Sequence, residues 1–231
     1  MKTKYLRLLK KVLLNTLEEN GQNLQRIMEG KTTHPGSYTM VGWKRLCNVE
    51  DCLNDVIEND IEGDIIETGV WKGGVTIFIK ALLDADGITD KKVWVADSFE
   101  GCPIPELSQD KGFDLYKRKD YAISLESVRE NFVKFSLLDE QVCFLKGWFR
   151  DTLPGIKAKK FCLIRLDGDL YESTMNGLDY LYPKLANGGW IIVDDYNCYD
   201  PCRKAVDHYR KKHQIKNPIV TIDWTGICWK K

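Results

Sequence analysis

Two apolar runs that each end in neighbouring acids limit most strongly how this chain can fold. Residues 161–166 (FCLIRL) lead into Asp167-Gly168-Asp169, and residues 190–193 (WIIV) lead into Asp194-Asp195. Each run has the length and the branched apolar content of a strand in the middle of a parallel sheet. Ligands of open α/β sheets bind beyond the carboxyl ends of the strands. If the two strands are neighbours, four carboxylates converge there.

Strand-like and helix-like segments alternate from about residue 60 onward. Further strands are predicted at 65–66, 93–96 and 142–145, and helices at 76–83, 125–135, 175–185 and 203–213. This alternation predicts a parallel, doubly wound α/β sheet. Two last apolar segments, 219–222 and 227–229, flank a turn at Thr225-Gly226 and predict a terminal hairpin, which makes the sheet edge antiparallel.

The start of the chain has a different character. Residues 1–60 are predicted to form a helical extension or lid, and residues 61–231 one compact domain. Leu6, Leu9, Leu13 and Leu17 have the spacing of a helical stripe that covers the sheet or a neighbouring subunit. The long polar segment 98–122 is expected to be a lid or a binding loop.

The composition excludes several classes of partner. With 231 residues and 43% hydrophobic content, the chain can build one substantial core. Its 34 basic and 34 acidic residues cancel, so neither nucleic acid nor an anionic membrane is the expected partner. No stretch approaches the roughly 20 apolar residues of a spanning helix. The eight cysteines are interpreted as reduced thiols, and the expected location is the cytoplasm.

The clustered acids predict a cation site. Four like charges in one crevice are costly without a counter-ion, and hard oxygen ligands suit Mg²⁺. Three carboxylates can hold one octahedral ion, which leaves the fourth as a general base. The alternative is structural: Asp167 and Asp169 would form a turn, and Asp194 or Asp195 would cap the next helix.

A glycine-rich turn follows the strand at 65–66 and opens a helix. The segment 67–74 (ETGVWKGG) matches neither the GxGxxG dinucleotide pattern nor a phosphate-binding P-loop. It suits a cofactor that has an ammonium and carboxylate tail, with Glu67 facing the ammonium. The alternative is an ordinary strand-to-helix turn.

Three further residues follow the ends of predicted strands. Asp97 is placed to bind ribose hydroxyls, or alternatively to cap a helix. Trp71 and Trp148 could pack against an adenine ring or a substrate.

The longest motifs together resemble one known family. They are 63–74 (GDIIETGVWKGG), 93–101 (VWVADSFEG), 144–154 (FLKGWFRDTLP), 165–174 (RLDGDLYEST), 193–196 (VDDY) and 222–226 (IDWTG). In this order they closely resemble the macrocin O-methyltransferase (TylF/MycF/NovP) family of S-adenosylmethionine-dependent sugar O-methyltransferases. The resemblance runs from about residue 38 to the end, including 39–42 (TMVG).

The resemblance implies a class I methyltransferase fold, with a Rossmann-like seven-stranded sheet and an antiparallel last strand. It implies S-adenosylmethionine as cofactor, bound by Thr39, Met40, Glu67, Thr68, Gly69, Gly73, Asp97, Ser98, Phe99, Trp148 and Asp167. It also implies Mg²⁺ held by Asp167, Asp194 and Asp195, with Asp169 as general base. Asp167 could share the role of base with metal binding. The acceptor would be a sugar or small-molecule glycoside, and the protein a homo-oligomer.

Some segments depart from the family pattern. The first 35 residues match only loosely, Cys102 stands where an apolar residue is expected, and 197–200 (NCYD) diverges. The first 35 residues and the 100–122 loop are therefore expected to shape the acceptor pocket. Two rival functions stay open at this point. One is a metal-dependent glycosyltransferase that uses Asp167-Gly168-Asp169 as a DxD motif, and the other is a non-catalytic binding module with a methyltransferase fold.

Overall fold

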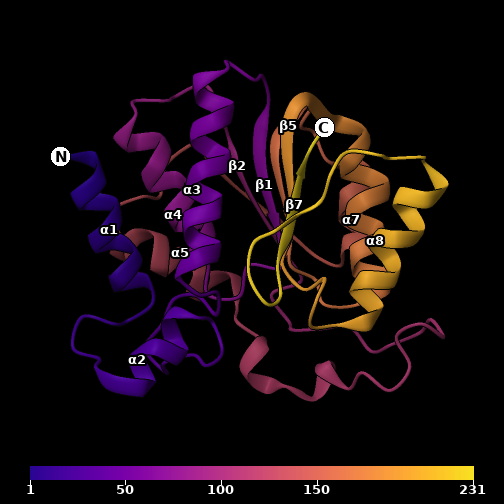
Figure 1. The fold of residues 1–231 in the computed structure, drawn as a ribbon, viewed down its shortest axis with the longest axis horizontal. Helices are drawn as coiled ribbons and strands as arrows, with labels where there is room; N and C mark the ends of the chain where they lie inside the picture. The colour runs from indigo at the N-terminus through magenta and orange to yellow at the C-terminus, as the bar shows by residue number, and fades with distance from the viewer.

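A seven-stranded sheet forms the centre of the computed structural model, which describes residues 1–231 (Figure 1). The strands are β1 (Asp64–Thr68), β2 (Val93–Asp97), β3 (Val142–Lys146), β4 (Phe161–Leu166), β5 (Leu185–Val193), β6 (Val220–Thr221) and β7 (Ile227–Lys230). Their order is β3-β2-β1-β4-β5-β7-β6. The first five are parallel, and β7 is antiparallel to both β5 and β6. The predicted class I methyltransferase sheet with an antiparallel last strand is confirmed.

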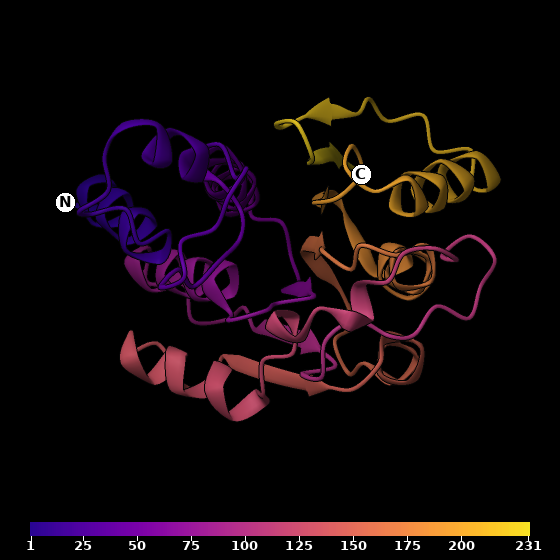
Figure 2. The same cartoon turned by 90° about the horizontal axis from the view of Figure 1, so that it is seen from below.

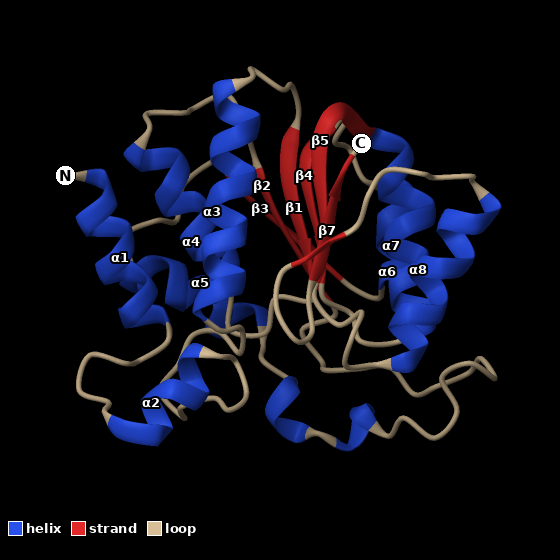
Figure 3. Ribbon diagram, in the orientation of Figure 1, coloured by secondary structure: helices blue, strands red, loops and turns tan.

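Helices cover both faces of this sheet (Figure 3). They are α1 (Lys2–Leu13), α2 (Gly21–Met28), α3 (Trp43–Glu58), α4 (Gly74–Ala85), α5 (Leu125–Lys134), α6 (Phe149–Thr152), α7 (Tyr171–Leu181) and α8 (Asp200–Lys212). Because successive strand residues point to opposite faces, Ile65 joins the core beneath α1, α3, α4 and α5, whereas Ile66 joins the core beneath α7 and α8. None of the helices combines the length and the apolar character needed to cross a membrane.

Several boundaries differ from the sequence expectation. Helix α1 ends at Leu13, so Leu17 does not continue the buried stripe of Leu6, Leu9 and Leu13 and is 57% exposed. The chain leaves the helix through Asn15, whose φ is 52°. Strand β5 begins at Leu185, not at Trp190, and the predicted helix 175–185 instead begins at Tyr171. The early part of β5 carries polar residues and glycines, which give no apolar strand signal.

The carboxyl ends of the parallel strands all face one side of the molecule. Helix α2 and the segment 98–122 both lie beyond these ends, at the bottom of Figure 1. Figure 2 views this side directly, with the N-terminal helices on one flank and the C-terminal helix α8 on the other.

Hydrogen bonds at Asp110 and at Asp120 help to fasten the segment 98–122 to the body of the protein. Asp110 is 1% exposed, and its carboxylate accepts hydrogen bonds from the backbone N–H groups of Tyr171 (2.6 Å) and Glu172 (3.0 Å). These are the first residues of α7, whose N–H groups have no partner within the helix. The indole of Trp71 donates to the carbonyl oxygen of Asp120 at 2.8 Å. The long segment is therefore an anchored loop.

Removing the first anchor is expected to loosen this loop. Asp110→Ala leaves the α7 N–H groups without an acceptor and should lower the free energy of unfolding by about 1–2 kcal/mol, the usual effect of losing a helix cap. Backbone amides of residues 100–122 should exchange hydrogen faster, as measured by mass spectrometry. The control is Asp114→Ala in the same loop, since Asp114 contacts only the exposed Lys117. Equal exchange in the two variants would contradict the anchoring role.

Candidate active site

A cavity of about 350 Å³ opens at the carboxyl ends of the parallel strands. Its wall combines distant parts of the chain: Gly30–Thr33, Thr39–Val41, Gly69–Trp71, Asp97–Ser98, Trp148–Arg150, Asp167–Asp169, Asp194–Asp195 and Trp224–Thr225 all contribute. The size is that of a small-molecule site. The position agrees with the rule for ligand binding in open α/β sheets.

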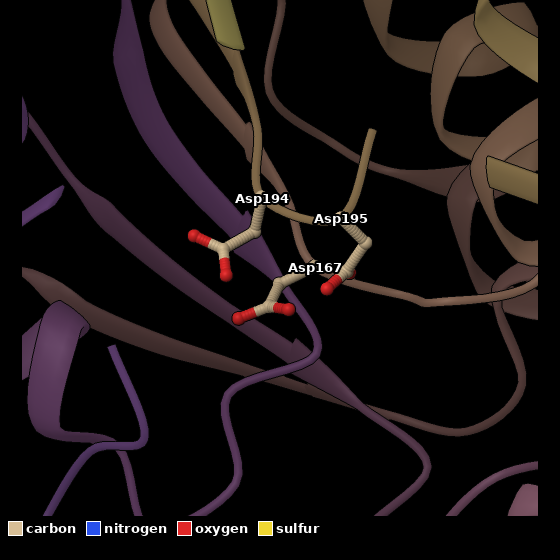
Figure 4. Close-up of side chains that lie close together, drawn as sticks. All are labelled: Asp167, Asp194 and Asp195. Atoms are coloured by element: carbon tan, nitrogen blue, oxygen red, sulfur yellow. The ribbon is translucent and has the colours of Figure 1, made fainter. Parts of the chain in front are cut away.

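Three of the predicted acids meet at one edge of this cavity. Strands β4 and β5 are neighbours, with Leu166 opposite Val193, so the residues that follow them lie side by side. Carboxylate oxygens of Asp167, Asp194 and Asp195 all lie within 4.8 Å of one another. Figure 4 shows the three side chains projecting from these two strand ends into the same space. The convergence predicted from the sequence is thus present.

Asp169 stands beside this trio and is positioned separately. Its φ is 57°, a left-handed conformation that aspartate tolerates better than most residues. Its backbone N–H donates to Asp195 Oδ2 at 3.3 Å, and the thiol of Cys102 lies 3.8 Å from its Oδ2. Burial, together with Asp167 and Asp194, raises the pKa of Asp169 to about 7. A carboxyl of this kind is a suitable proton acceptor near neutral pH.

A buried arginine for which the sequence predicted no role connects the acids. Arg165 is the second-to-last residue of β4 and is 1% exposed. Its Nη1 donates to Glu67 Oε1 at 2.5 Å and to Asp167 Oδ2 at 2.7 Å, and its Nη2 donates to Asp194 Oδ1. One planar guanidinium therefore orients the acids at the ends of three neighbouring strands. The sequence could have revealed this residue, because it is an arginine within an apolar run and a buried charge needs partners of opposite charge.

A second arginine reaches Asp194 from the N-terminal part of the chain. Arg45 on α3 is buried, and its Nη1 donates to Asp194 Oδ2. Its Nε lies 3.0 Å from Asp223 Oδ2, in the turn between β6 and β7. Both oxygens of Asp194 are thus bonded to guanidinium groups. No motif pointed to Arg45, because its partners are far away in the sequence.

The positive charge of the two arginines does not balance the negative charge of all the clustered acids. Burial alone would raise the pKa of Asp194, but Arg165 and Arg45 hold it below its ordinary value. In contrast, burial and the neighbouring Asp169, Asp167 and Asp194 raise the pKa of Asp195 well above its ordinary range. Burial and Asp194 also raise the pKa of Asp167. A cation at the trio would remove this repulsion.

Glu67 presents an unused oxygen at the end of β1. The side chain is 1% exposed, Oε1 accepts from Arg165, and the buried Oε2 has no hydrogen-bond partner. Burial, opposed in part by Arg165, raises the pKa of Glu67 to about 8. Because buried polar atoms are nearly always paired, this oxygen is a position for a donor on a ligand.

The glycine turn after Glu67 is shaped by close backbone contacts. Gly69 has φ 82°, and a Cβ there would lie 1.7 Å from the carbonyl oxygen of Asp167, so only glycine fits. The N–H of Gly74 donates to the carbonyl oxygen of Tyr38 at 2.9 Å. This bond brings Thr39 and Met40 to the cavity wall beside the turn.

Asp97 secures the neighbouring loop. Its Oδ2 accepts from the N–H of Val70 at 2.8 Å, and its Oδ1 accepts from the N–H of Phe99 at 2.7 Å. Burial raises the pKa of Asp97, although these backbone hydrogen bonds oppose the shift. No helix begins directly after Asp97, so the alternative of a helix cap is excluded. Its carboxylate also lines the cavity and can accept further hydrogen bonds there.

The structure brings most of the predicted site residues to one cavity. Those that line it are Thr39, Met40, Glu67, Gly69, Asp97, Ser98, Trp148, Asp167, Asp169, Asp194 and Asp195. Thr68, Gly73 and Phe99 lie behind the wall. The carbonyl of Thr68 accepts from Asp167, Gly73 precedes α4, and Phe99 packs in the core. Trp71 and Trp148 both line the cavity.

Comparison with known proteins agrees with this arrangement. The family model described as Macrocin-O-methyltransferase (TylF) matches residues 22–231. The chain is 43% identical to demethyldecarbamoylnovobiocin O-methyltransferase of Streptomyces niveus, over 98% of this chain and 93% of that protein. It is 37% identical to mycinamicin III 3''-O-methyltransferase of Micromonospora griseorubida, over 98% and 96%. The solved structure of the O-methyltransferase NovP superposes with a TM-score of 0.96 at 44% identity, covering 100% of this chain and 99% of that one.

Proposed function

The chain belongs to the macrocin O-methyltransferase (TylF) family and is an S-adenosylmethionine-dependent O-methyltransferase, and we propose that it methylates a sugar hydroxyl of a small-molecule glycoside with the help of Mg²⁺. Similar proteins act on such molecules: one relative, 44% identical, is a rhamnosyl-tetracenomycin 4'-O-methyltransferase of Streptomyces olivaceus. The observation that carries the proposal is the acid trio placed beside Asp169 in one cavity.

The cavity offers groups suited to each part of the cofactor. The unpartnered Oε2 of Glu67 would accept a hydrogen bond from the cofactor ammonium, and Asp97 would accept from the ribose hydroxyls. The close turn at Gly69 lets the ligand approach the backbone. When bound, S-adenosylmethionine supplies a methyl group on a sulfonium that leaves readily.

The trio of Asp167, Asp194 and Asp195 would hold the cation. Its hard carboxylate oxygens and uncompensated negative charge suit Mg²⁺. The ion would supply Lewis acidity that lowers the pKa of a coordinated hydroxyl.

Asp169 would complete the reaction as the general base. Its carboxylate would accept the proton of the acceptor hydroxyl when that oxygen takes the methyl group. Arg165 keeps Glu67, Asp167 and Asp194 in place during this step. The anchored loop 98–122 and the N-terminal residues Gly30–Thr33 border the cavity and would exclude water from it.

A screen with labelled cofactor tests the proposed acceptor and the role of the cation. Sugar-bearing small molecules are incubated with labelled S-adenosylmethionine, with and without a chelator. We expect transfer to at least one glycoside, at least about tenfold lower after chelation and restored by Mg²⁺. Transfer that is insensitive to chelation would contradict the cation role.

Calorimetry separates the rival functions. The methyltransferase should bind S-adenosylhomocysteine and not a nucleoside diphosphate, whereas a glycosyltransferase that uses Asp167 and Asp169 as a DxD motif would show the opposite. Cofactor binding without transfer to any glycoside would favour the non-catalytic module.

Asp195→Asn tests the proposed ligand set directly. The substitution removes one carboxylate charge from the trio, so Mg²⁺ affinity is expected to fall by at least about tenfold. Affinity for S-adenosylhomocysteine should change little, since the side-chain hydrogen bonds of Asp195 are to Asp169 and Cys198 and not to Glu67 or Asp97. Both affinities are measured by calorimetry. An unchanged Mg²⁺ affinity would remove Asp195 from the ligand set.

A further inference from the structure

Arg45 connects the acid trio to a part of the cavity wall that comes from both ends of the chain. A Cβ on Gly30 would lie 2.4 Å from Arg45 Nη2, so the residues after α2 pack directly on the guanidinium. Asp223, the other acidic neighbour of Arg45, shapes the turn between β6 and β7. In that turn the indole of Trp224 donates to the carbonyl oxygen of Glu29 at 2.9 Å, which joins the two wall segments.

Arg45 shares an acceptor with the proposed ion. Its Nη1 bonds to Asp194 Oδ2, and Arg165 occupies Asp194 Oδ1. An ion that uses Asp194 as a ligand must therefore share an oxygen with one guanidinium. Arg165 has three acidic partners and is fixed within a strand, whereas Arg45 contacts Asp194 from a separate helix. The hydrogen bond between Arg45 and Asp194 is therefore the one that can break when an ion binds.

A second acceptor for Arg45 is already in place. Asp223 Oδ2 lies 3.0 Å from Arg45 Nε, yet the two atoms form no hydrogen bond and each is buried without any other partner. Asp223 Oδ1 is fully used by Thr225 and Gly226, so the turn keeps its shape while Oδ2 stays available. A small rotation of the guanidinium would exchange Asp194 for Asp223.

We propose that Arg45 is a positioning residue that competes with the divalent cation for Asp194 and thereby couples cation binding to the wall formed by residues 29–33 and 223–226. This inference rests on the cation site of the proposed function. With the ion absent, Arg45 neutralises Asp194. With the ion bound, Arg45 bonds to Asp223, and the wall adjusts around it. The acceptor side of the cavity would then take its final shape only when the cation is in place.

The direction in which cation affinity changes when Arg45 is replaced distinguishes competition from simple structural support. Arg45→Met removes a positive charge that bonds to a proposed ligand of the ion, so Mg²⁺ or Mn²⁺ should bind at least about tenfold tighter. A residue that only supports the fold would make binding weaker when removed. Binding is measured by calorimetry and by Mn²⁺ electron paramagnetic resonance, without cofactor or acceptor.

Two further variants and one dynamic readout complete the test. Arg45→Lys keeps the charge and should restore affinity to near the wild-type value. Asp223→Asn leaves Arg45 with Asp194 alone and should weaken cation binding severalfold. In wild type, Mg²⁺ should change the hydrogen exchange of residues 29–33 and 223–226, and this change should vanish in Arg45→Met. If Arg45→Met does not fold, Arg45→Gln removes the same charge but keeps polar groups in the buried position, and its cation affinity should likewise rise above that of wild type.

The outcomes separate this inference from the function on which it rests. If wild type binds a cation but Arg45→Met binds it no tighter, or Asp223→Asn no more weakly, the competition is disproved and the metal site stands. If wild type binds no divalent cation, the cation part of the proposed function fails, and the role of Arg45 fails with it.

Discussion

Asp169→Asn is expected to lower turnover by about 10²- to 10⁴-fold, the usual effect of removing a general base. Asparagine keeps the size of the side chain and its place in the left-handed turn, but its amide cannot accept the proton of the acceptor hydroxyl. Asp169 is not one of the three clustered acids that we propose as ligands, so Mg²⁺ affinity should change much less than turnover. Affinity for S-adenosylhomocysteine should be nearly unchanged, because Glu67 and Asp97 are intact.

The measurements are turnover with an identified acceptor and calorimetry with both ligands. The matched control is Asp90→Asn, an exposed acid far from the cavity, which should have no effect on either. Normal turnover in Asp169→Asn would eliminate Asp169 as the base. If Asp167→Asn then abolished turnover while cation affinity remained, the role would pass to Asp167.

The convergence of the acids could be predicted from the sequence because it depends on strand ends and chain order alone. The runs ending at Leu166 and Val193 are each long and apolar, and parallel strands place their carboxyl ends on one side of a sheet. The glycine turn after Glu67 was recognisable for a similar reason, since Gly69 and Gly73 both have positive φ. Local patterns of this kind are fixed within a few residues.

The charge pairs of the site could not be predicted, because they join residues that only the tertiary fold brings together. Arg165 and Glu67 are 98 residues apart, and Arg45 and Asp194 are 149 apart. The attachment of Asp110 to the first turn of α7 spans 61 residues. None of these pairs leaves a periodic signal. The prediction for Leu17 was wrong although a periodic signal was present. Its spacing matched the helical stripe, but the helix ends four residues earlier.

Arg165→Met is expected to lower the free energy of unfolding by about 3–5 kcal/mol, the range measured when one partner of a buried ion pair is removed. Methionine fills much of the volume but leaves Glu67, Asp167 and Asp194 without their shared guanidinium. The free energy of unfolding of Arg165→Lys should lie between those of wild type and Arg165→Met, because an ammonium retains the charge but cannot make the planar, forked hydrogen bonds of a guanidinium. Urea unfolding followed by circular dichroism gives the values.

A pH series distinguishes lost charge pairing from lost packing. Arg165 helps to hold the pKa of Asp194 below its ordinary value, so this contribution to stability is present above the unfolded pKa of about 4 and is lost below it. The deficit of Arg165→Met relative to wild type should therefore be largest near neutral pH and shrink as the pH falls below about 4. The control is Lys160→Met, whose exposed pair with Glu62 should contribute less than about 1 kcal/mol. A deficit that stayed constant with pH would assign the effect of Arg165 to packing, not to its charge.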